Sequence, residues 1–205
     1  MTILLISLYV AAELIANVTA SKPVAVAGLV VPAAVFIYAL TFTLLDLINE
    51  RLGKAKARQV IYAALAANLL LAGYVQLAVA LPAASFYEGQ EAFSRVLGST
   101  PRIVFASLTA YLVSSIIDTE VFAWWRQRIG RHRWARVLAS NAVSTLIDSV
   151  VFITLAFAGV MPVLPLIRGQ YIVKMVVTVV SIPLIYLVRA GLPSRERQRA
   201  WEPAP

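Results

Sequence analysis

Cysteine is absent from this chain of 205 residues, and histidine occurs once, as His132 in an arginine-rich segment. Without cysteine there is no disulfide bond, no thiolate nucleophile and no Cys-ligated metal. A single histidine does not suffice for a histidine-based metal site or a catalytic triad. We therefore expect no metal and no cofactor.

Charged residues are scarce as well. Asp, Glu, Lys and Arg make up 14% of the chain, hydrophobic residues make up 60%, and the mean hydropathy is +0.81. Soluble domains carry about 25% charged residues. The composition therefore indicates an integral membrane protein that has the lipid bilayer as its main partner.

A phosphate-binding loop is missing too. Leu52-Gly53-Lys54 lacks both the preceding Gly and the following Ser or Thr of such a loop. Any use of ATP must then involve other subunits. The net charge of +8 does not indicate nucleic-acid binding, because the basic residues lie in short clusters between apolar stretches.

Apolar stretches of about 20 residues are long enough to cross a bilayer as helices. Six of them occur, and the connections between them are short, the longest being Pro82 to Pro101 with room for a short surface helix or loop. The stretches are Ile3 to Ala20, Leu29 to Asn49, Val60 to Leu81, Ile103 to Trp125, Val137 to Val160 and Leu166 to Val188. We predict an all-α membrane protein with one six-helix domain, residues 1–192, and a basic cytoplasmic tail, residues 193–205.

Basic residues predict the orientation, because Lys and Arg near the ends of spans resist translocation. Thirteen of the eighteen lie on one side of the predicted spans, in three clusters. These clusters are residues 51–58, 126–136 and 189–199. We predict a multi-pass protein of the plasma (inner) membrane with both termini in the cytoplasm.

Ionisable groups inside predicted spans are candidate functional residues, because each costs a few kcal/mol in hydrocarbon. Lys174 is the one basic residue placed in this way, so we expect it to pair with Asp148 or Glu13. Such a pair could bind substrate or carry a proton, or it could be a neutral packing pair. The polar residues in the spans are Glu13, Asn17, Asp46, Asn49, Asn68, Gln76, Asp118, Glu120, Asn141, Asp148 and Lys174.

An internal repeat favours the functional interpretation. Residues 113–122, VSSIIDTEVF, are echoed by residues 143–152, VSTLIDSVVF, on the next span. Consecutive spans run in opposite directions, so Asp118 and Asp148 could approach one cavity from opposed helices. Chance recurrence, with the Ser and Thr residues serving as contacts between helices, is the alternative.

Small residues form a stripe on the first span. Ala12, Ala16 and Ala20 recur at intervals of four, which allows another helix to approach closely. Internal packing is the interpretation we favour, and docking against a separate membrane subunit is the alternative.

The polar positions and their neighbours resemble the queuosine precursor transporter family, also called the vitamin uptake transporter family. The similarity extends over most of the chain, motif by motif. It rests on Phe36-Ile37-Tyr38 with Asp46, Glu50, Gly53, Ala57 and Arg58; on residues 106–111 (ASLTAY) with Asp118 and Val121-Phe122; on Ser140, Ser144, Asp148, Phe152 and Ala156-Phe157; and on Tyr171, Lys174, Pro183 and Tyr186. The first span contributes mainly Asn17 and Lys22.

This resemblance implies import of a 7-deazaguanine base, namely 7-cyano- or 7-aminomethyl-7-deazaguanine or queuine, which are used in tRNA modification. It also implies a fold similar to the substrate-binding subunits of energy-coupling-factor transporters. The residues suit such a ligand, because a carboxylate can accept adjacent N–H groups of a guanine-like edge and aromatic rings can stack on the base. The candidate substrate-binding residues are Glu13, Asn17, Tyr111, Asp118, Asp148, Phe152, Gln170 and Lys174. The candidates for gating or proton coupling are Asp46, Glu50 and Lys174.

Two other functions are compatible with the sequence. One is the substrate-capture subunit of an energy-coupling-factor transporter for another vitamin, working with external subunits. The other is an intramembrane enzyme with Asp118 and Asp148 as an acid and base pair, which we do not favour because binding or proton relay needs no further catalytic group. Either function leaves open whether the protein forms a homo-oligomer.

Overall fold

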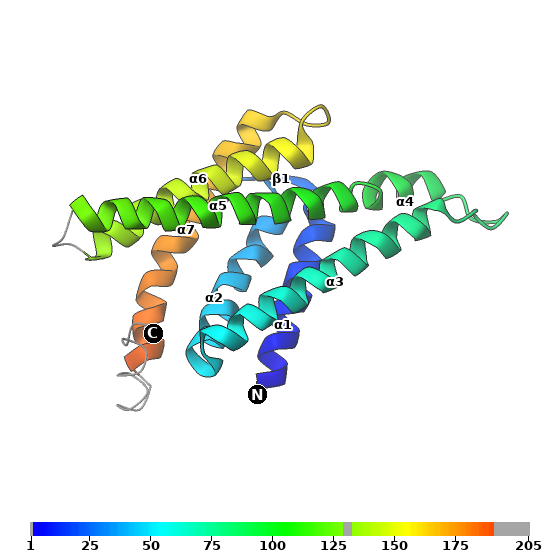
Figure 1. The fold of residues 1–205 in the computed structure, drawn as a ribbon. Coiled ribbons are helices and arrows are strands. Elements are labelled where there is room, and N and C mark those ends of the chain that lie inside the picture. The colour runs from blue at the N-terminus through cyan, green and yellow to red at the C-terminus, as the bar shows by residue number, and fades with distance from the viewer. Residues whose placement is uncertain (1, 129–132, 191–205) are drawn as a thin grey trace.

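The computed structural model describes residues 2–128 and 133–190, which are mostly helical (Figure 1). Within the helices, the side chains of some positions, among them 46, 50 and 118–128, are not described. The elements are α1 (Thr2–Thr19), β1 (Pro23–Val26), β2 (Leu29–Pro32), α2 (Ala34–Leu52), α3 (Lys54–Ala80), α4 (Gln90–Leu97), α5 (Thr100–Arg128), α6 (Arg133–Phe157) and α7 (Val163–Ala190).

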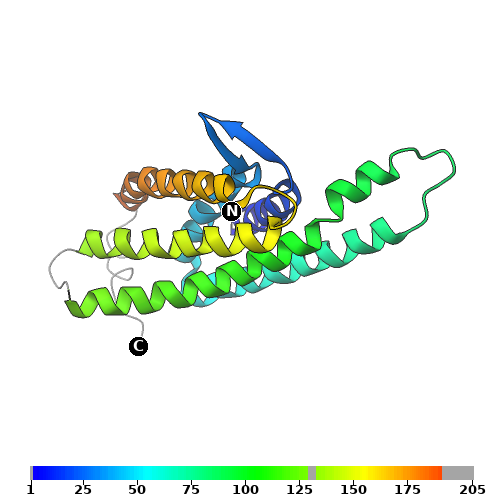
Figure 2. The ribbon, with the colours of Figure 1, turned by 90° about the horizontal axis from the view of Figure 1, so that it is seen from above.

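Two groups of helices cross one another. Helices α1, α2 and α7 have roughly aligned axes, with α1 antiparallel to α2 and α7, while α5 and α6 lie side by side, antiparallel, and cross them at a steep angle (Figures 1 and 2). Helix α3 follows a diagonal path along α1 and reaches α5. The antiparallel α5 and α6 pair carries the two copies of the internal repeat on opposed helices, as the sequence predicts.

All six apolar stretches of the sequence are mainly helical, and α4 lies in the long connection where a short surface helix or a loop was expected. Four stretches of the described residues are long and apolar enough to cross a membrane: Thr2–Thr19, Ala55–Ala80, Gln90–Ser114 and Val163–Val180. Residues Ala34–Asn49 and Ala142–Phe157 form shorter apolar helices. A helical membrane protein is therefore confirmed, whereas the crossing of the membrane by all six long helices stays a prediction.

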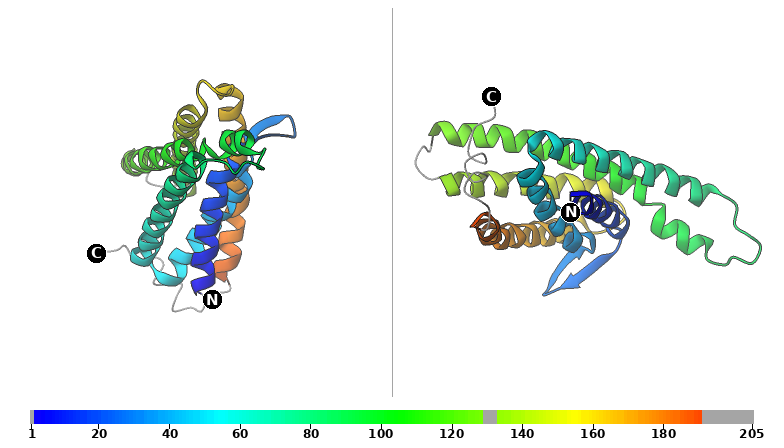
Figure 3. Two further views of the ribbon diagram at one scale, coloured as in Figure 1. Left: turned by 90° about the vertical axis from the view of Figure 1, so that its right-hand side faces the viewer. Right: turned by 90° about the horizontal axis from the view of Figure 1, so that it is seen from below.

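A β-hairpin replaces the expected start of the second span. Residues Leu29–Pro32 are a strand paired antiparallel with Pro23–Val26, so the prediction of a helix from Leu29 was wrong. Ala27 (φ 50°) and Gly28 (φ 78°) form the two-residue turn, and two successive positive φ values match the right-handed twist of hairpin strands. The hairpin protrudes from the helices in Figure 3.

The hairpin is held against α7 by a very close backbone approach. A Cβ atom on Gly169 would lie 2.1 Å from the carbonyl oxygen of Val30, so only glycine fits at this contact. The residue that follows Gly169 on α7 is Gln170, which the sequence predicts to bind substrate. Helix α7 therefore presents Gln170 next to the inner end of strand β2.

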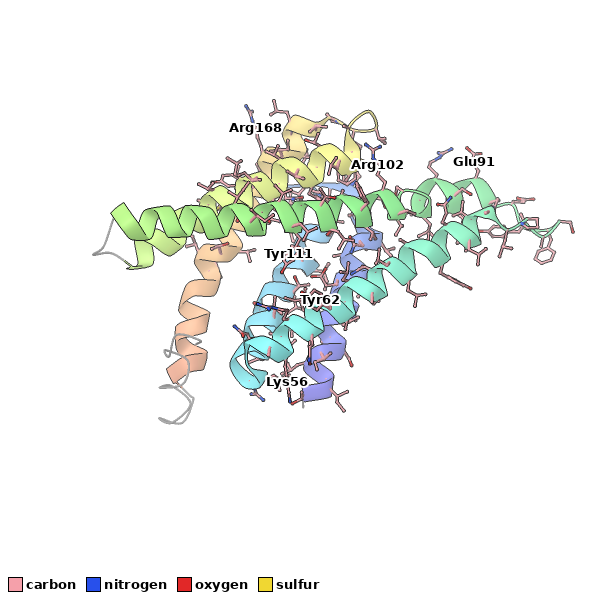
Figure 4. All side chains as sticks on the ribbon, in the orientation of Figure 1. Lys56, Tyr62, Glu91, Arg102, Tyr111 and Arg168 are labelled. Carbon is pink, nitrogen blue, oxygen red and sulfur yellow. The ribbon has the colours of Figure 1, made fainter. Side chains whose placement is uncertain are left out.

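Basic residues of the predicted cytoplasmic and outer sides lie at opposite ends of the bundle. The turn between α2 and α3, which Gly53 makes with a φ of 80°, lies at the end where α1 begins and α7 finishes (Figure 1). Figure 4 places Lys56 at this end and both Arg102 and Arg168 at the opposite end. These three residues lie on the sides expected for them, and the orientation in the membrane stays a prediction.

Two clusters of buried apolar side chains stabilise the fold. The hairpin-end core consists of Ala16, Ala20, Ala34, Ile103, Ala106, Ile153, Ala156, Phe157 and Leu166. The turn-end core consists of Tyr9, Leu44, Ile48, Ala57, Val60 and Ala64. The alanine stripe of α1 is buried along its length, which agrees with internal packing rather than a free docking surface.

Candidate functional site

A small cavity of about 30 Å³ adjoins the hairpin-end core, between α1, α2, α5, α6, α7 and strand β2. Four alanines contribute to the lining, so space remains where larger side chains would fill it. The lining residues are Ala16, Asn17, Ala20, Pro32, Ala34, Val35, Tyr38, Ser107, Ala110, Asp148, Phe152, Gln170 and Lys174.

An ion pair joins two helices at the cavity wall. The ammonium group of Lys174 on α7 donates to Oδ2 of Asp148 on α6, and both side chains are largely buried. The Lys174 Nζ atom also lies 5.0 Å from the ring centroid of Tyr38, a distance at which a cation is attracted to an aromatic face. The expected pairing of Lys174 is thus present, with Asp148 as its direct partner.

Glu13, the other expected partner of Lys174, does not line the cavity. Its carboxyl group is near the Thr41 side chain and is attracted electrostatically to Lys174. The Thr41 hydroxyl donates to the carbonyl oxygen of Tyr38 over 2.8 Å. Two carboxyl groups therefore attract Lys174, one on α1 and one on α6.

Asn17 lines the cavity through a side chain whose amide hydrogens are both used elsewhere. Its Nδ2 atom donates to Oδ1 of Asn68 over 2.7 Å and to the carbonyl oxygen of Glu13 over 3.2 Å. The carbonyl oxygen Oδ1 of Asn17 makes no hydrogen bond within the described part of the chain. The sequence suggested that Asn17 donates a hydrogen bond to the ligand. In the structure only its Oδ1 atom is available, and this atom can only accept.

Gln170 has a buried amide group without a hydrogen-bond partner. The residue is 3% exposed and lines the cavity, and no described group accepts from or donates to its side chain. Among the described residues, the side-chain atoms that are completely enclosed and lack a hydrogen-bond partner are Thr100 Oγ1 and Ser149 Oγ. The amide atoms of Gln170 are not in this group, so they keep some open space beside them. A buried amide that keeps access only to a cavity can bind a ligand without first breaking a protein hydrogen bond.

Phe152 supplies an aromatic face to the cavity lining. Its ring packs edge to face against that of Phe157, with 5.9 Å between the ring centroids and 89° between the planes. Phe157 belongs to the hairpin-end core, so this contact fixes one side of the Phe152 ring.

Among the other predicted site residues whose side chains are described, Tyr111 is not brought into the cavity lining. Tyr111 is 43% exposed and lies outside it. The side chains of Asp46, Glu50 and Asp118 lie outside the described residues. In the part of the chain that the structure describes, no three His, Asp or Glu side chains group as metal ligands, so the cavity offers hydrogen bonds, charge and ring faces.

Sequence reasoning missed Ser107, which lines the cavity. Its neighbours on α5 are Ala106, which is buried, and Ala110, which is buried and also lines the cavity. Sequence reasoning also missed the role of Arg102, whose guanidinium donates to the carbonyl oxygens of Leu155 and Ala158, each over 2.7 Å, at the end of α6. The signal for Ser107 was a hydroxyl within a run of small residues. Arg102 carried no comparable signal, because its acceptors are more than fifty residues away in the chain.

Comparison with known proteins shows the family of the chain. Residues 32–188 match the family described as "Putative vitamin uptake transporter". The chain is also 30% identical over 191 residues, 91% of this chain and 83% of the relative, to the "Probable queuosine precursor transporter" of Bacillus subtilis (strain 168). The chain belongs to this transporter family. No solved structure matches the chain.

Membership of the vitamin uptake transporter family identifies the chain as a membrane transporter and not an enzyme. The family match begins at Pro32, so it contains Tyr38, Asp148, Phe152, Gln170 and Lys174, all of which line the cavity. Asn17 lies before the matched residues. Its place in the lining is therefore an observation that the family match does not supply.

Proposed function

We propose that this transporter imports a queuosine precursor, either 7-cyano- or 7-aminomethyl-7-deazaguanine or queuine, by binding the base in the cavity. One observation carries the proposal. Five of the eight side chains that the sequence suggests for substrate binding line a single cavity: Asn17, Asp148, Phe152, Gln170 and Lys174. The relative in Bacillus subtilis bears the name of a queuosine precursor transporter, which agrees with this substrate class.

The polar groups of the cavity complement a guanine-like ring. Lys174 binds Oδ2 of Asp148, so Oδ1 can accept an N–H group of the base. Gln170 can both donate to a ring carbonyl and accept from a ring N–H group, as amides do in pairs. Phe152 and Tyr38 offer ring faces for stacking.

Release of the base requires that the cavity open to the cytoplasm, and charged groups are the candidates for controlling this step. Asp46, Glu50 and Lys174 are proposed for gating or proton coupling, with Glu13 and Asp148 as the carboxyl groups near Lys174. A proton on either carboxyl group would weaken its attraction to Lys174. Asp118 and Tyr111 are proposed to contact the base from α5 when the cavity closes around it.

The proposed membrane topology is the one that the basic residues of the sequence predict. We propose a single six-helix domain, residues 1–192, in the inner membrane, with both termini and the basic tail, residues 193–205, in the cytoplasm. Similarity to the substrate-binding subunits of energy-coupling-factor transporters, self-association and external energy-coupling subunits are further expectations from the family resemblance.

Ligand-induced thermal stabilisation of the purified protein tests the substrate class, because a ligand that binds the native state raises its apparent stability. The panel contains 7-cyano- and 7-aminomethyl-7-deazaguanine, queuine, guanine and a set of vitamins. We expect stabilisation by a 7-deazaguanine at concentrations where guanine and the vitamins have little effect. Selective stabilisation by a vitamin would instead favour a capture subunit for that vitamin, and co-purification with an ATPase would support that alternative.

A further inference from the structure

Asn68 lies outside the cavity, yet its hydrogen bonds determine what the cavity presents to a ligand. The residue is on α3, is 4% exposed and does not line the cavity. Its Nδ2 atom donates to the carbonyl oxygen of Ala64 over 3.0 Å, and its Oδ1 atom accepts from Asn17. The side chain thus connects the backbone of α3 with Asn17, a residue of the cavity wall on α1.

The direction of these hydrogen bonds is fixed by the backbone. A carbonyl oxygen can only accept, so the group of Asn68 that faces Ala64 must be the NH2 group. The oxygen of Asn68 then faces Asn17, and Asn17 must turn its own NH2 group toward it. The reversed orientation of either amide would place two acceptors or two donors against one another.

The consequence appears at Asn17. Its second amide hydrogen is donated to the carbonyl oxygen of Glu13, so no hydrogen remains for a ligand. Its Oδ1 atom has no hydrogen-bond partner among the described residues. The atom is also not completely enclosed by the protein. Because Asn17 lines the cavity, this oxygen is the polar group that the residue can present to a bound molecule.

We propose that Asn68 is a positioning residue that restricts Asn17 to the role of hydrogen-bond acceptor, so that the cavity selects ligands with an N–H group at that place. This inference rests on the proposed function for the ligand, a 7-deazaguanine base with several N–H groups. Asn68 contributes no contact to the ligand. It acts on specificity because, together with the carbonyl oxygen of Glu13, it supplies one of the two acceptors that hold the Asn17 NH2 group away from a ligand.

The test compares how strongly the wild type and two variants distinguish the base from analogues. The probes are 7-cyano-7-deazaguanine, the analogue without its exocyclic amine, and the analogue methylated at N9, each titrated into purified protein. In the wild type at least one analogue should bind roughly 5- to 100-fold more weakly than the parent base, the cost of one lost hydrogen bond. In Asn68→Leu the same analogue should lose part of this penalty, because only the carbonyl oxygen of Glu13 then holds the Asn17 NH2 group in place.

Asn68→Asp is the matched control. The carboxyl group that this substitution introduces would, when protonated, donate to the carbonyl oxygen of Ala64 and accept from Asn17. When ionised, it would still accept from Asn17. The analogue penalty in this variant should therefore equal that of the wild type. A purely structural role for Asn68 would lower the affinities of all three probes by the same factor and leave their ratios unchanged.

The outcomes are separable. Binding of the base by the wild type with the same analogue penalty in Asn68→Leu would overturn this inference and leave the proposed function intact. An unchanged penalty in Asn68→Asp together with a reduced one in Asn68→Leu would establish it. If Asn68→Leu does not fold, Asn68→Ser provides the second variant, with the same expectation. Failure of the wild type to bind any of the probes would overturn the proposed function and the inference that depends on it.

Discussion

The two buried cores of this protein are built from similar elements but leave different amounts of space. At the turn end, Tyr9, Leu44, Ile48 and Val60 pack around two alanines, and the core is closed by large side chains. At the hairpin end, alanines from α1, α2, α5 and α6 make up much of the core, and the cavity adjoins them. The difference shows that small side chains leave open space beside one core, whereas large side chains close the other.

Polar groups gather at the cavity beside the hairpin-end core. Asn17, Asp148, Gln170 and Lys174 line it. Unpartnered or charged groups cost free energy when buried, so their concentration beside open space indicates a ligand site rather than a packing solution. Substitutions at the hairpin end should therefore change ligand binding, and substitutions at the turn end should change only stability.

Asp148→Asn should have the largest effect of all, because it leaves Lys174 buried without its partner. We expect a loss of about 3–5 kcal/mol of stability and a decrease in base affinity of roughly 30-fold or more. Thermal denaturation and titration with the base measure the two quantities. The double variant Asp148→Asn/Lys174→Met removes the unpaired charge and should recover stability without recovering affinity. Recovery of both would show that the ion pair serves packing alone.

Ile48→Ala and Ile153→Ala compare the two cores directly, because both side chains are fully buried, one in each core. Each should cost about 2–5 kcal/mol through the space left behind. Only Ile153→Ala should weaken base binding, since Ile153 adjoins Phe152 on α6. Equal loss of affinity in both variants would mean that the cavity does not have a local role in binding.

Gly169→Ala should cost about 1–3 kcal/mol, because its methyl group collides with the carbonyl oxygen of Val30. The displaced hairpin and Gln170 should also weaken base binding. Gly73→Ala is the control, since a Cβ atom there meets nothing within 4 Å. An alanine in the middle of α3 should raise stability by up to about 1 kcal/mol. Identical denaturation temperatures for both variants would contradict the close contact.

Gln170→Leu should have the smallest effect on stability and still weaken binding. The amide has no hydrogen-bond partner in the described part of the chain, so its removal should change stability by less than about 1 kcal/mol. Base affinity should fall roughly 5- to 100-fold through the lost hydrogen bonds. Gln76→Leu, at an exposed position on α3, should change neither quantity. A stable Gln170→Leu variant with wild-type affinity would remove Gln170 from the site.

The sequence predicted the helices and many of the residues that line the cavity, for reasons that are local. Runs such as Val60 to Leu81 are long and apolar, and a charged residue such as Lys174 inside such a run needs a partner. The hairpin was not predicted, because Ala27-Gly28 is a weak turn signal and the valines beside it continue the apolar run of the second span. A short apolar run can form either a strand or a helix.

Contacts between distant residues were beyond sequence reasoning. Asn17 and Asn68 were both recognised as polar residues in spans, but their hydrogen bond depends on how α1 packs against α3. The need for glycine at position 169 depends on the position of Val30 on another element. The family resemblance supplied the substrate class, and the structure supplied the grouping of Asn17 with Gln170 and Lys174 around one cavity.

The most direct test of the account is an experimental structure of the protein with 7-cyano-7-deazaguanine bound. The account predicts the base in the cavity beside Phe152, with an N–H group within about 3.2 Å of Asn17 Oδ1 and a hydrogen bond to the amide of Gln170. A base bound outside this cavity, or inside it without contact to Asn17 and Gln170, would contradict the assignment of the site.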